Sequence, residues 1–223
     1  MRVNEGFLRP FERWALPRVA RALPRWVTPD GLTALALAAA VGGGVAYALA
    51  GENAGWLWIA SGALAVHWFG DSLDGTLARV RDERRERYGF FVDHTCDALS
   101  VVVLCVGVGA GSLMRMELAL GLALAVLGLM LHVMMVTVAR GTFKLSFGRI
   151  GPTELRLLLV AFNTVAWALG TRSVHAFGTT WTVFEAGALA VTVGVVATWA
   201  GSAVREARAL DRLDAERADA ERR

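Results

Sequence analysis

Long apolar stretches dominate this sequence and limit what the chain can fold into. Six of them lie over residues 33–50, 55–73, 89–110, 118–139, 155–170 and 183–203. At about 1.5 Å of rise per residue, each is roughly long enough to cross a 30 Å hydrocarbon core as a helix, the fifth only marginally. The 55% hydrophobic composition agrees with this interpretation. The sequence therefore predicts an all-α, polytopic membrane protein with six transmembrane helices.

Basic residues gather in every second connection between these stretches. Of 23 lysines and arginines, 21 lie in the N-terminal segment, in residues 79–88, in residues 140–156 or in the tail from residue 205, and the opposite connections hold only Arg115 and Arg172. Because basic loops stay on the cytoplasmic side, both termini are predicted to be cytoplasmic. All but one of the basic residues are arginine, which indicates a GC-rich, bacterial genome. We therefore expect a multi-pass protein of the cell (inner) membrane. The pI of about 9.4 then reflects topology and anionic lipid, with no nucleic acid as a partner.

Both ends of the chain carry charged segments outside the spans. Residues 1–28 interleave apolar side chains with arginines, which predicts an amphipathic surface segment broken or kinked by Pro10, Pro17 and Pro24. No apolar core precedes a small-residue cleavage site, so no cleavable signal peptide is expected. Residues 204–223 mix both signs at helical spacing, which predicts a solvated extension of the sixth span that contributes to dimer contacts. Without internal repeats or linkers, residues 1–223 are interpreted as one domain.

Four aspartates lie where the second span ends and the third begins. Asp71 and Asp74 are three residues apart, and Asp93 and Asp97 are four apart, so each pair shares one helix face. In antiparallel neighbouring spans, Asp74 would face Asp93 and Asp71 would face Asp97. We therefore expect all four carboxylates to meet about two turns inside the cytoplasmic boundary.

Four carboxylates at this depth require compensation. A single aspartate at the centre of a span costs roughly 2.5–3.5 kcal/mol on insertion scales, and like charges also repel one another. A protonated, hydrogen-bonded cluster or a set of helix caps is the structural alternative. Divalent cations offset both the cost of burying the charges and their mutual repulsion. All-oxygen ligation suits Mg²⁺ or Mn²⁺, and four carboxylates can bridge two ions. The pattern therefore predicts a site for two divalent metal ions.

These residues resemble the signature of the CDP-alcohol phosphotransferase (CDP-alcohol phosphatidyltransferase) family. That signature is D-x-x-D-G-x-x-A-R, a short gap, and then G-x-x-x-D-x-x-x-D. The matching positions here are Asp71, Asp74, Gly75, Ala78, Arg79, Gly89, Asp93 and Asp97. Residues 80–88 make the gap one residue longer than is usual in the family, which a solvated loop tolerates at little cost.

The resemblance implies a six-span fold with a cytoplasm-facing cavity, usually in a homodimer. It implies that the four aspartates hold two metal ions and the CDP pyrophosphate, and that Asp97 is the general base. Gly75, Ala78 and Arg79 would line the nucleotide site. The implied activity is metal-dependent transfer of a phospho-alkyl group from a CDP-linked donor to an alcohol hydroxyl in phospholipid biosynthesis, with release of CMP.

Two further groups of residues concern the substrates. Residues 29–33 (PDGLT) resemble the start of the family's first span, where Thr33 would approach the nucleotide, or they form a turn with an N-cap by Asp30 or Thr33. Polar residues near the same cytoplasmic mouth could hold an anionic acceptor or a lipid headgroup, or the basic ones could only fix topology. This second group comprises Lys144, Arg140, Arg149, Glu154 and Arg156.

The identity of the donor distinguishes the remaining hypotheses. CDP-diacylglycerol with a small polar alcohol is the first choice, since a bacterial origin favours it. A CDP-aminoalcohol of choline or ethanolamine type with diacylglycerol is the alternative, supported by Asp93-His94 and Glu154. A membrane prenyltransferase or an ion-coupled transporter is a more distant possibility, since both place aspartates in spans. The sequence does not identify the acceptor alcohol.

Overall fold

The computed structural model describes residues 8–140, 152–169, 173–176 and 178–222. In this part of the chain the structure has helices and one β-hairpin. They are α1 (Arg9–Ala22), α2 (Pro29–Leu49), α3 (Trp56–Val80), α4 (Glu86–Ala110), α5 (Met116–Arg140), α6 (Pro152–Leu169), β1 (Ser173–Ala176), β2 (Thr179–Thr182) and α7 (Val183–Glu221). The predominantly helical architecture agrees with the prediction from the sequence.

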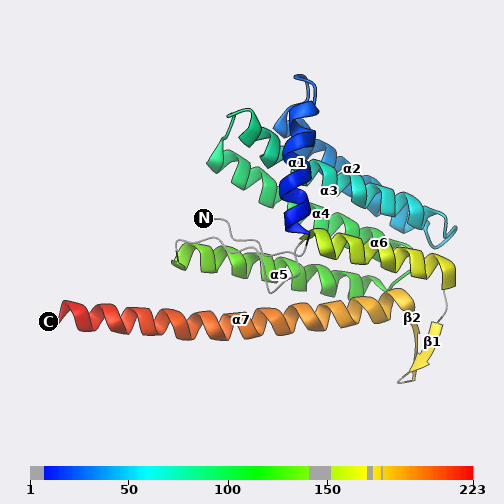
Figure 1. Cartoon of the computed structure of the whole chain (residues 1–223). Helices are drawn as coiled ribbons and strands as arrows, with labels where there is room; N and C mark the ends of the chain where they lie inside the picture. The colour runs from blue at the N-terminus through cyan, green and yellow to red at the C-terminus, as the bar shows by residue number, and fades with distance from the viewer. Residues whose placement is uncertain (1–7, 141–151, 170–172, 177, 223) are drawn as a thin grey trace.

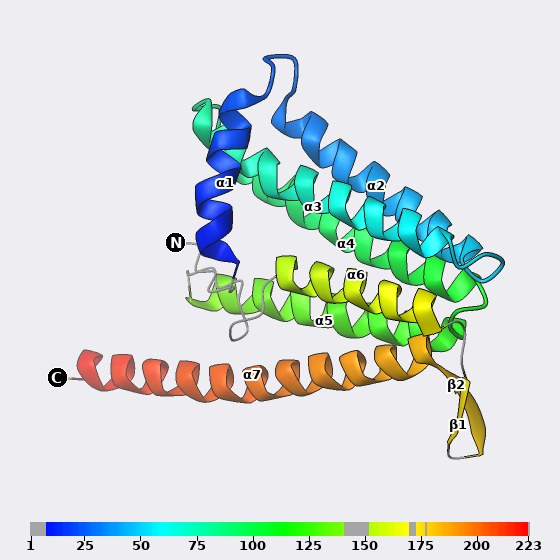
Figure 2. The same cartoon turned by 45° about the vertical axis from the view of Figure 1, so that its right-hand side comes forward.

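The long helices run back and forth, nearly antiparallel to one another (Figures 1 and 2). Helix α2 packs against both α3 and α4, and α5 connects α4 to α7 by packing against each of them. Helix α6 lies against α3, while α1 crosses the end of α3 at a steep angle in both views. Each of the six predicted spans falls on one of the helices α2 to α7.

Four described helices are long and apolar enough to cross a membrane, namely α2, α4, α5 and α7. Helices α3 and α6 are not among these four. Helix α3 carries Asp71, Asp74 and Arg79, and α6 has 18 residues with Glu154 and Arg156 in its first turns. The multi-pass membrane architecture is therefore confirmed, whereas the number of six spans stays a prediction.

Close backbone contact between helices explains the tight packing of α2 with its neighbours. A Cβ atom added to Gly107 of α4 would clash with the carbonyl oxygen of Gly44 of α2. A Cβ atom on Gly70 of α3 would lie 2.5 Å from the carbonyl oxygen of Leu32. Small residues of this kind let helices in a membrane approach closely and gain van der Waals contact. The α2–α3–α4 unit that holds the aspartates is built on these contacts.

A buried polar network ties α6 to α2 and α3. The Asn163 Nδ2 atom donates to the Tyr47 hydroxyl at 2.9 Å and to the Ser61 hydroxyl at 3.1 Å. All three side chains are buried. An amide left unpaired in an apolar interior costs several kcal/mol on water-to-hydrocarbon scales, so these bonds specify how α6 sits against the other two helices.

The amphipathic N-terminal segment forms helix α1. Pro10 lies in its first turn, and the helix continues past Pro17 to Ala22. Phe11 and Trp14 are exposed, whereas Ala20 is buried against apolar side chains of α3. This division of exposed and buried apolar groups agrees with a helix that lies on the membrane surface.

Arg81 follows the end of α3 and links the α3–α4 connection to the α1–α2 connection. Its guanidinium donates to the backbone carbonyls of Leu23 at 3.2 Å, Pro24 at 2.9 Å and Val27 at 2.5 Å. The next residue, Asp82, has a φ of 59°, a left-handed conformation that turns the chain toward α4. The unusually long gap after Arg79 thus contains an anchor for the segment between α1 and α2.

One of the two interpretations of residues 29–33, an N-cap of α2 by Asp30 or Thr33, was wrong. Neither Asp30 nor Thr33 caps the helix; Thr28 does, because its hydroxyl accepts the backbone N–H of Gly31 at 3.0 Å. Pro29 occupies the first helical position, where its missing N–H has no intrahelical role. Thr33 is therefore left for a contact in the interior.

A hairpin that the sequence did not predict lies at the end opposite Arg81. Strands β1 and β2 pair antiparallel, and Gly178 at a φ of 73° allows the turn between them. The Thr182 hydroxyl caps α7 and also donates to the Leu113 carbonyl at 2.7 Å. Glu185 completes the capping box and pairs with Arg115 at 2.8 Å.

Helix α7 continues without interruption from Val183 to Glu221 (Figure 1). The sequence predicted this charged helical extension of the last apolar stretch. Its contribution to dimer contacts stays a prediction.

Candidate active site

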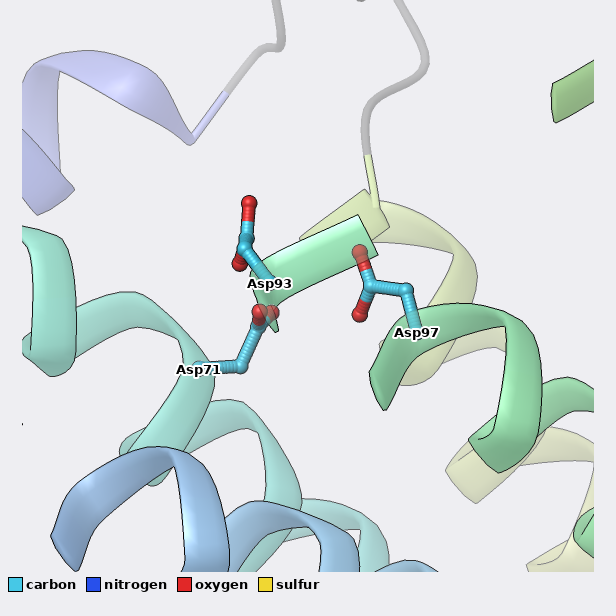
Figure 3. Close-up of side chains that lie close together, drawn as sticks. All are labelled: Asp71, Asp93 and Asp97. Carbon is cyan, nitrogen blue, oxygen red and sulfur yellow. The ribbon is translucent and has the colours of Figure 1, made fainter. Parts of the chain in front are cut away.

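Carboxylates converge in a small pocket between α2, α3 and α4. One carboxylate oxygen from each of Asp71, Asp93 and Asp97 lies within 4.8 Å of the other two. Figure 3 shows Asp71 reaching from α3 toward the two aspartates of α4. The i, i+4 spacing of Asp93 and Asp97 places both on the helix face that α3 approaches. The convergence predicted from the two aspartate pairs is therefore present for these three residues.

Asp74 is the exception to the predicted four-carboxylate cluster. It lines the same pocket, but it does not belong to the group of oxygens within 4.8 Å of one another. Its Oδ2 atom accepts the Thr33 hydroxyl at 2.7 Å, and its Oδ1 atom accepts the backbone N–H of Gly75. The Thr33 bond directs the carboxylate toward α2 and the Gly75 bond ties it to its own helix, which corrects the expectation that all four groups meet.

Asp71 is also held by a basic residue from α6. The Arg156 Nη2 atom lies 2.7 Å from Asp71 Oδ2, and the two side chains are only 16% and 19% exposed. A charge-assisted bond of this kind is stronger than a neutral one, particularly where water is largely excluded. Arg156 was predicted to bind an acceptor or headgroup, and its contact in the structure is with a carboxylate of the site.

The three carboxylates fit a divalent cation. Oxygens on opposite sides of a Mg²⁺ ion are about 4 Å apart, because each Mg–O distance is about 2.0–2.1 Å. The observed spacing of up to 4.8 Å therefore requires only small side-chain movements to reach one ion. All-oxygen donors also match the preference of Mg²⁺ and Mn²⁺. The arrangement can thus hold a metal.

The glycines of the signature do not serve helix packing. A Cβ atom added to Gly75 or to Gly89 would meet nothing within 4 Å, unlike one added at the packed glycines of α2 and α4. Ala78 is partly buried, and Arg79 is exposed and donates to the Thr76 hydroxyl at 3.0 Å. The side of α3 that carries Gly75 thus has room for a ligand next to the carboxylates.

The other residues predicted to bind an acceptor do not line this pocket or lie outside the described residues. Arg140 pairs with Glu206 of α7 at 2.5 Å. Glu154 accepts the backbone N–H of Leu8 at 2.8 Å, which ties α6 to the start of α1. Lys144 and Arg149 lie outside the residues that the structure describes.

The sequence analysis missed two buried polar residues of the pocket. His67 and Ser100 both line the pocket, and both are buried. His67 lies four residues before Asp71, and Ser100 lies three residues after Asp97, so each shares a helix face with an aspartate. That spacing could have identified them.

Comparisons with a family profile and with solved structures found similar proteins, whereas a search of the curated proteins found no match. Among solved structures, the chain is similar to a Mycobacterium tuberculosis phosphatidylinositol phosphate synthase crystallised with CDP-DAG bound. The identity is 22%, the TM-score is 0.61, and the similarity covers 88% of this chain and 94% of the other. This likeness shows a shared fold.

A comparison with family profiles matches residues 26–200 to the CDP-alcohol phosphatidyltransferase family. The matched region includes helices α2 to α6 and all four aspartates. Because the match extends over most of the chain, this protein belongs to the CDP-alcohol phosphatidyltransferase family, membrane enzymes that transfer a substituted phosphate group.

Proposed function

We propose that this enzyme transfers a phosphatidyl group from CDP-diacylglycerol to the hydroxyl of a small polar alcohol and releases CMP. The observation that carries the proposal is the convergence of Asp71, Asp93 and Asp97 in a pocket of a chain that belongs to this family. The structural neighbour was crystallised with CDP-DAG bound, which supports a lipid-linked donor. The reaction would take place at the inner membrane, with the site open to the cytoplasm, in a homodimer.

The donor's nucleotide would lie at the side of α3 that carries the signature residues. Gly75 leaves open space there, and Ala78 and Arg79 follow on the same helix toward its end. Thr33 holds the carboxylate of Asp74 and so fixes it beside the proposed nucleotide site. Arg79 is placed to meet a phosphate with its guanidinium.

The carboxylates would hold two divalent ions, Mg²⁺ or Mn²⁺, together with the donor's pyrophosphate. Asp71, Asp93 and Asp97 already lie close enough to share one ion, and Asp74 adjoins them in the pocket. When bound, such ions neutralise the pyrophosphate and the charge that develops on the departing CMP.

Asp97 would take the proton from the attacking hydroxyl. Asp71 has one oxygen paired with Arg156, and both oxygens of Asp74 accept hydrogen bonds from Thr33 and Gly75. Those contacts would hold both carboxylates in place as ligands. The family signature places the base at Asp97, and Asp97 lines the pocket.

The acceptor would approach from the cytoplasmic mouth. Arg140, Lys144, Arg149 and Glu154 stay predicted contacts for it or for a lipid headgroup. Arg156 pairs with Asp71 and therefore lies beside the reacting centre. Among the predicted acceptor residues that the structure describes, it is the one we expect to meet an anionic acceptor.

The experiment is a screen for CMP release by the purified protein in detergent or liposomes with Mg²⁺. CDP-diacylglycerol is supplied with a panel of small alcohols, and CDP-choline or CDP-ethanolamine is supplied with diacylglycerol in parallel. We expect CMP and a new phosphatidyl ester, identified by mass spectrometry, only with CDP-diacylglycerol. Turnover of the CDP-aminoalcohols would assign the other donor class, and an absence of CMP with every donor would refute the transfer function.

A further inference from the structure

His67 carries a buried nitrogen that no described residue satisfies. The side chain is 5% exposed, and its Nδ1 atom has no hydrogen-bond partner within the described part of the chain. Burying a polar group without a partner is costly, and nearly all such groups in folded proteins are paired. Because His67 also lines the pocket of the aspartates, a bound molecule is the natural partner for this nitrogen.

His67 lies deeper in the membrane-facing part of the pocket than the carboxylates do. It precedes Asp71 by four residues, so it lies about 6 Å farther along α3, away from the end at Val80. Ser100 lies three residues beyond Asp97 on the antiparallel helix α4, at a similar level, and is 4% exposed. His67 and Ser100 together form a polar floor on the membrane side of the carboxylates.

We propose that the polar floor hydrogen-bonds an acyl-ester oxygen of the lipid donor and so selects lipid-linked CDP over soluble CDP. This inference rests on the proposed function, in which the donor is CDP-diacylglycerol. With the pyrophosphate at the carboxylates, the cytidine lies toward water and the diacylglycerol toward the membrane interior. The first polar groups on that side are the ester carbonyls, which only accept hydrogen bonds.

The chemistry of the floor matches such a group. An imidazole protonated on Nδ1 donates through that nitrogen, and the Ser100 hydroxyl can also donate. The aspartates above the floor accept only, and Arg156 is engaged with Asp71. An ester carbonyl at the floor would therefore find donors, whereas a second phosphate there would face the negative carboxylates.

Equilibrium binding to the purified protein in detergent tests the proposal, with Mn²⁺ present and CDP-diacylglycerol and CDP as the two ligands. We expect His67→Leu to weaken CDP-diacylglycerol by roughly tenfold, the effect of one buried hydrogen bond, and to leave CDP unchanged. His67→Asn places an amide N–H near the position of Nδ1 and should restore binding. His67→Gln reaches the position of Nε2 and should not.

His132→Leu is the matched control, because His132 is a buried histidine of α5 whose Nε2 atom bonds Ser202 outside the pocket. It should leave the ratio of the two affinities unchanged. Equal weakening of both ligands by His67→Leu, or no weakening, would overturn the proposal, as would equal binding by the Asn and Gln variants. Should the wild type bind CDP-diacylglycerol no more tightly than CDP, the donor assignment itself would fail, and this inference with it.

Discussion

Replacement of Asp97 by Asn tests the assignment of the general base. The amide keeps the shape of the side chain and one oxygen near Asp71 and Asp93, whose carboxylates lie within 4.8 Å. It removes the basic oxygen that would accept the hydroxyl proton. General-base catalysis contributes roughly 10²–10⁴-fold, so kcat should fall by that factor. At about 1.36 kcal/mol per tenfold change, the activation barrier rises by about 2.7–5.4 kcal/mol.

Asp74→Asn is the matched comparison, because it makes the same chemical change in the same pocket. Asp74 accepts hydrogen bonds from Thr33 and Gly75, and an amide can keep only part of that arrangement. The lost negative charge should weaken metal and donor binding together. Asp97→Asn should instead preserve donor binding better than turnover.

The two variants are compared by donor affinity and by CMP release at saturating Mg²⁺. The base assignment fails if Asp97→Asn keeps a near-normal kcat. It also fails if Asp97→Asn loses donor binding as severely as Asp74→Asn, since Asp97 would then act only as a ligand.

Three further predictions concern the metal, the fold and the topology. A chelator should abolish CMP release and Mg²⁺ or Mn²⁺ should restore it; full turnover without divalent ions would contradict the metal site. Arg81→Gln leaves three backbone acceptors without their donor and should lower the free energy of unfolding by about 1–3 kcal/mol in thermal or chemical unfolding. Arg84→Gln, at an exposed position nearby, should change it by less than about 0.5 kcal/mol, and equal losses would refute the anchor. With native cysteines replaced, Glu83→Cys should be labelled only from the cytoplasm and Glu52→Cys only from outside, and the reverse result would invert the topology.

The helices and the aspartate cluster were predictable because local rules determine them. Long apolar stretches require helices in a membrane, and spacings of three and four residues place aspartates on one helix face. The depth argument brought Asp71, Asp93 and Asp97 together without any knowledge of the packing. These features depend on periodicity and length, which a single sequence contains.

The direction of an individual side chain was not predictable in the same way. Asp74 was expected to join the cluster, but a hydroxyl from α2 and the adjacent backbone N–H of Gly75 hold its carboxylate. The relevant donor, Thr33, is 41 residues away in the sequence and was considered as a nucleotide contact or as a helix cap. Thr28 caps α2 instead, because the helix begins at Pro29, and helix boundaries predicted from sequence are uncertain by a few residues. The hairpin of β1 and β2 lacked a periodic signal because each strand has only four residues.

Arg156 contacts Asp71 because its side chain lies on the face of α6 that packs against the rest of the protein. Asn163 lies seven residues after Arg156, which is about two helical turns, so both side chains project from nearly the same face. The buried bonds of Asn163 to Tyr47 and Ser61 fix the rotation of α6, and that rotation directs Arg156 toward the aspartates. A substitution at Asn163 should therefore disturb the active site without touching it, because the ion pair depends on a helix orientation that is set deeper in the membrane.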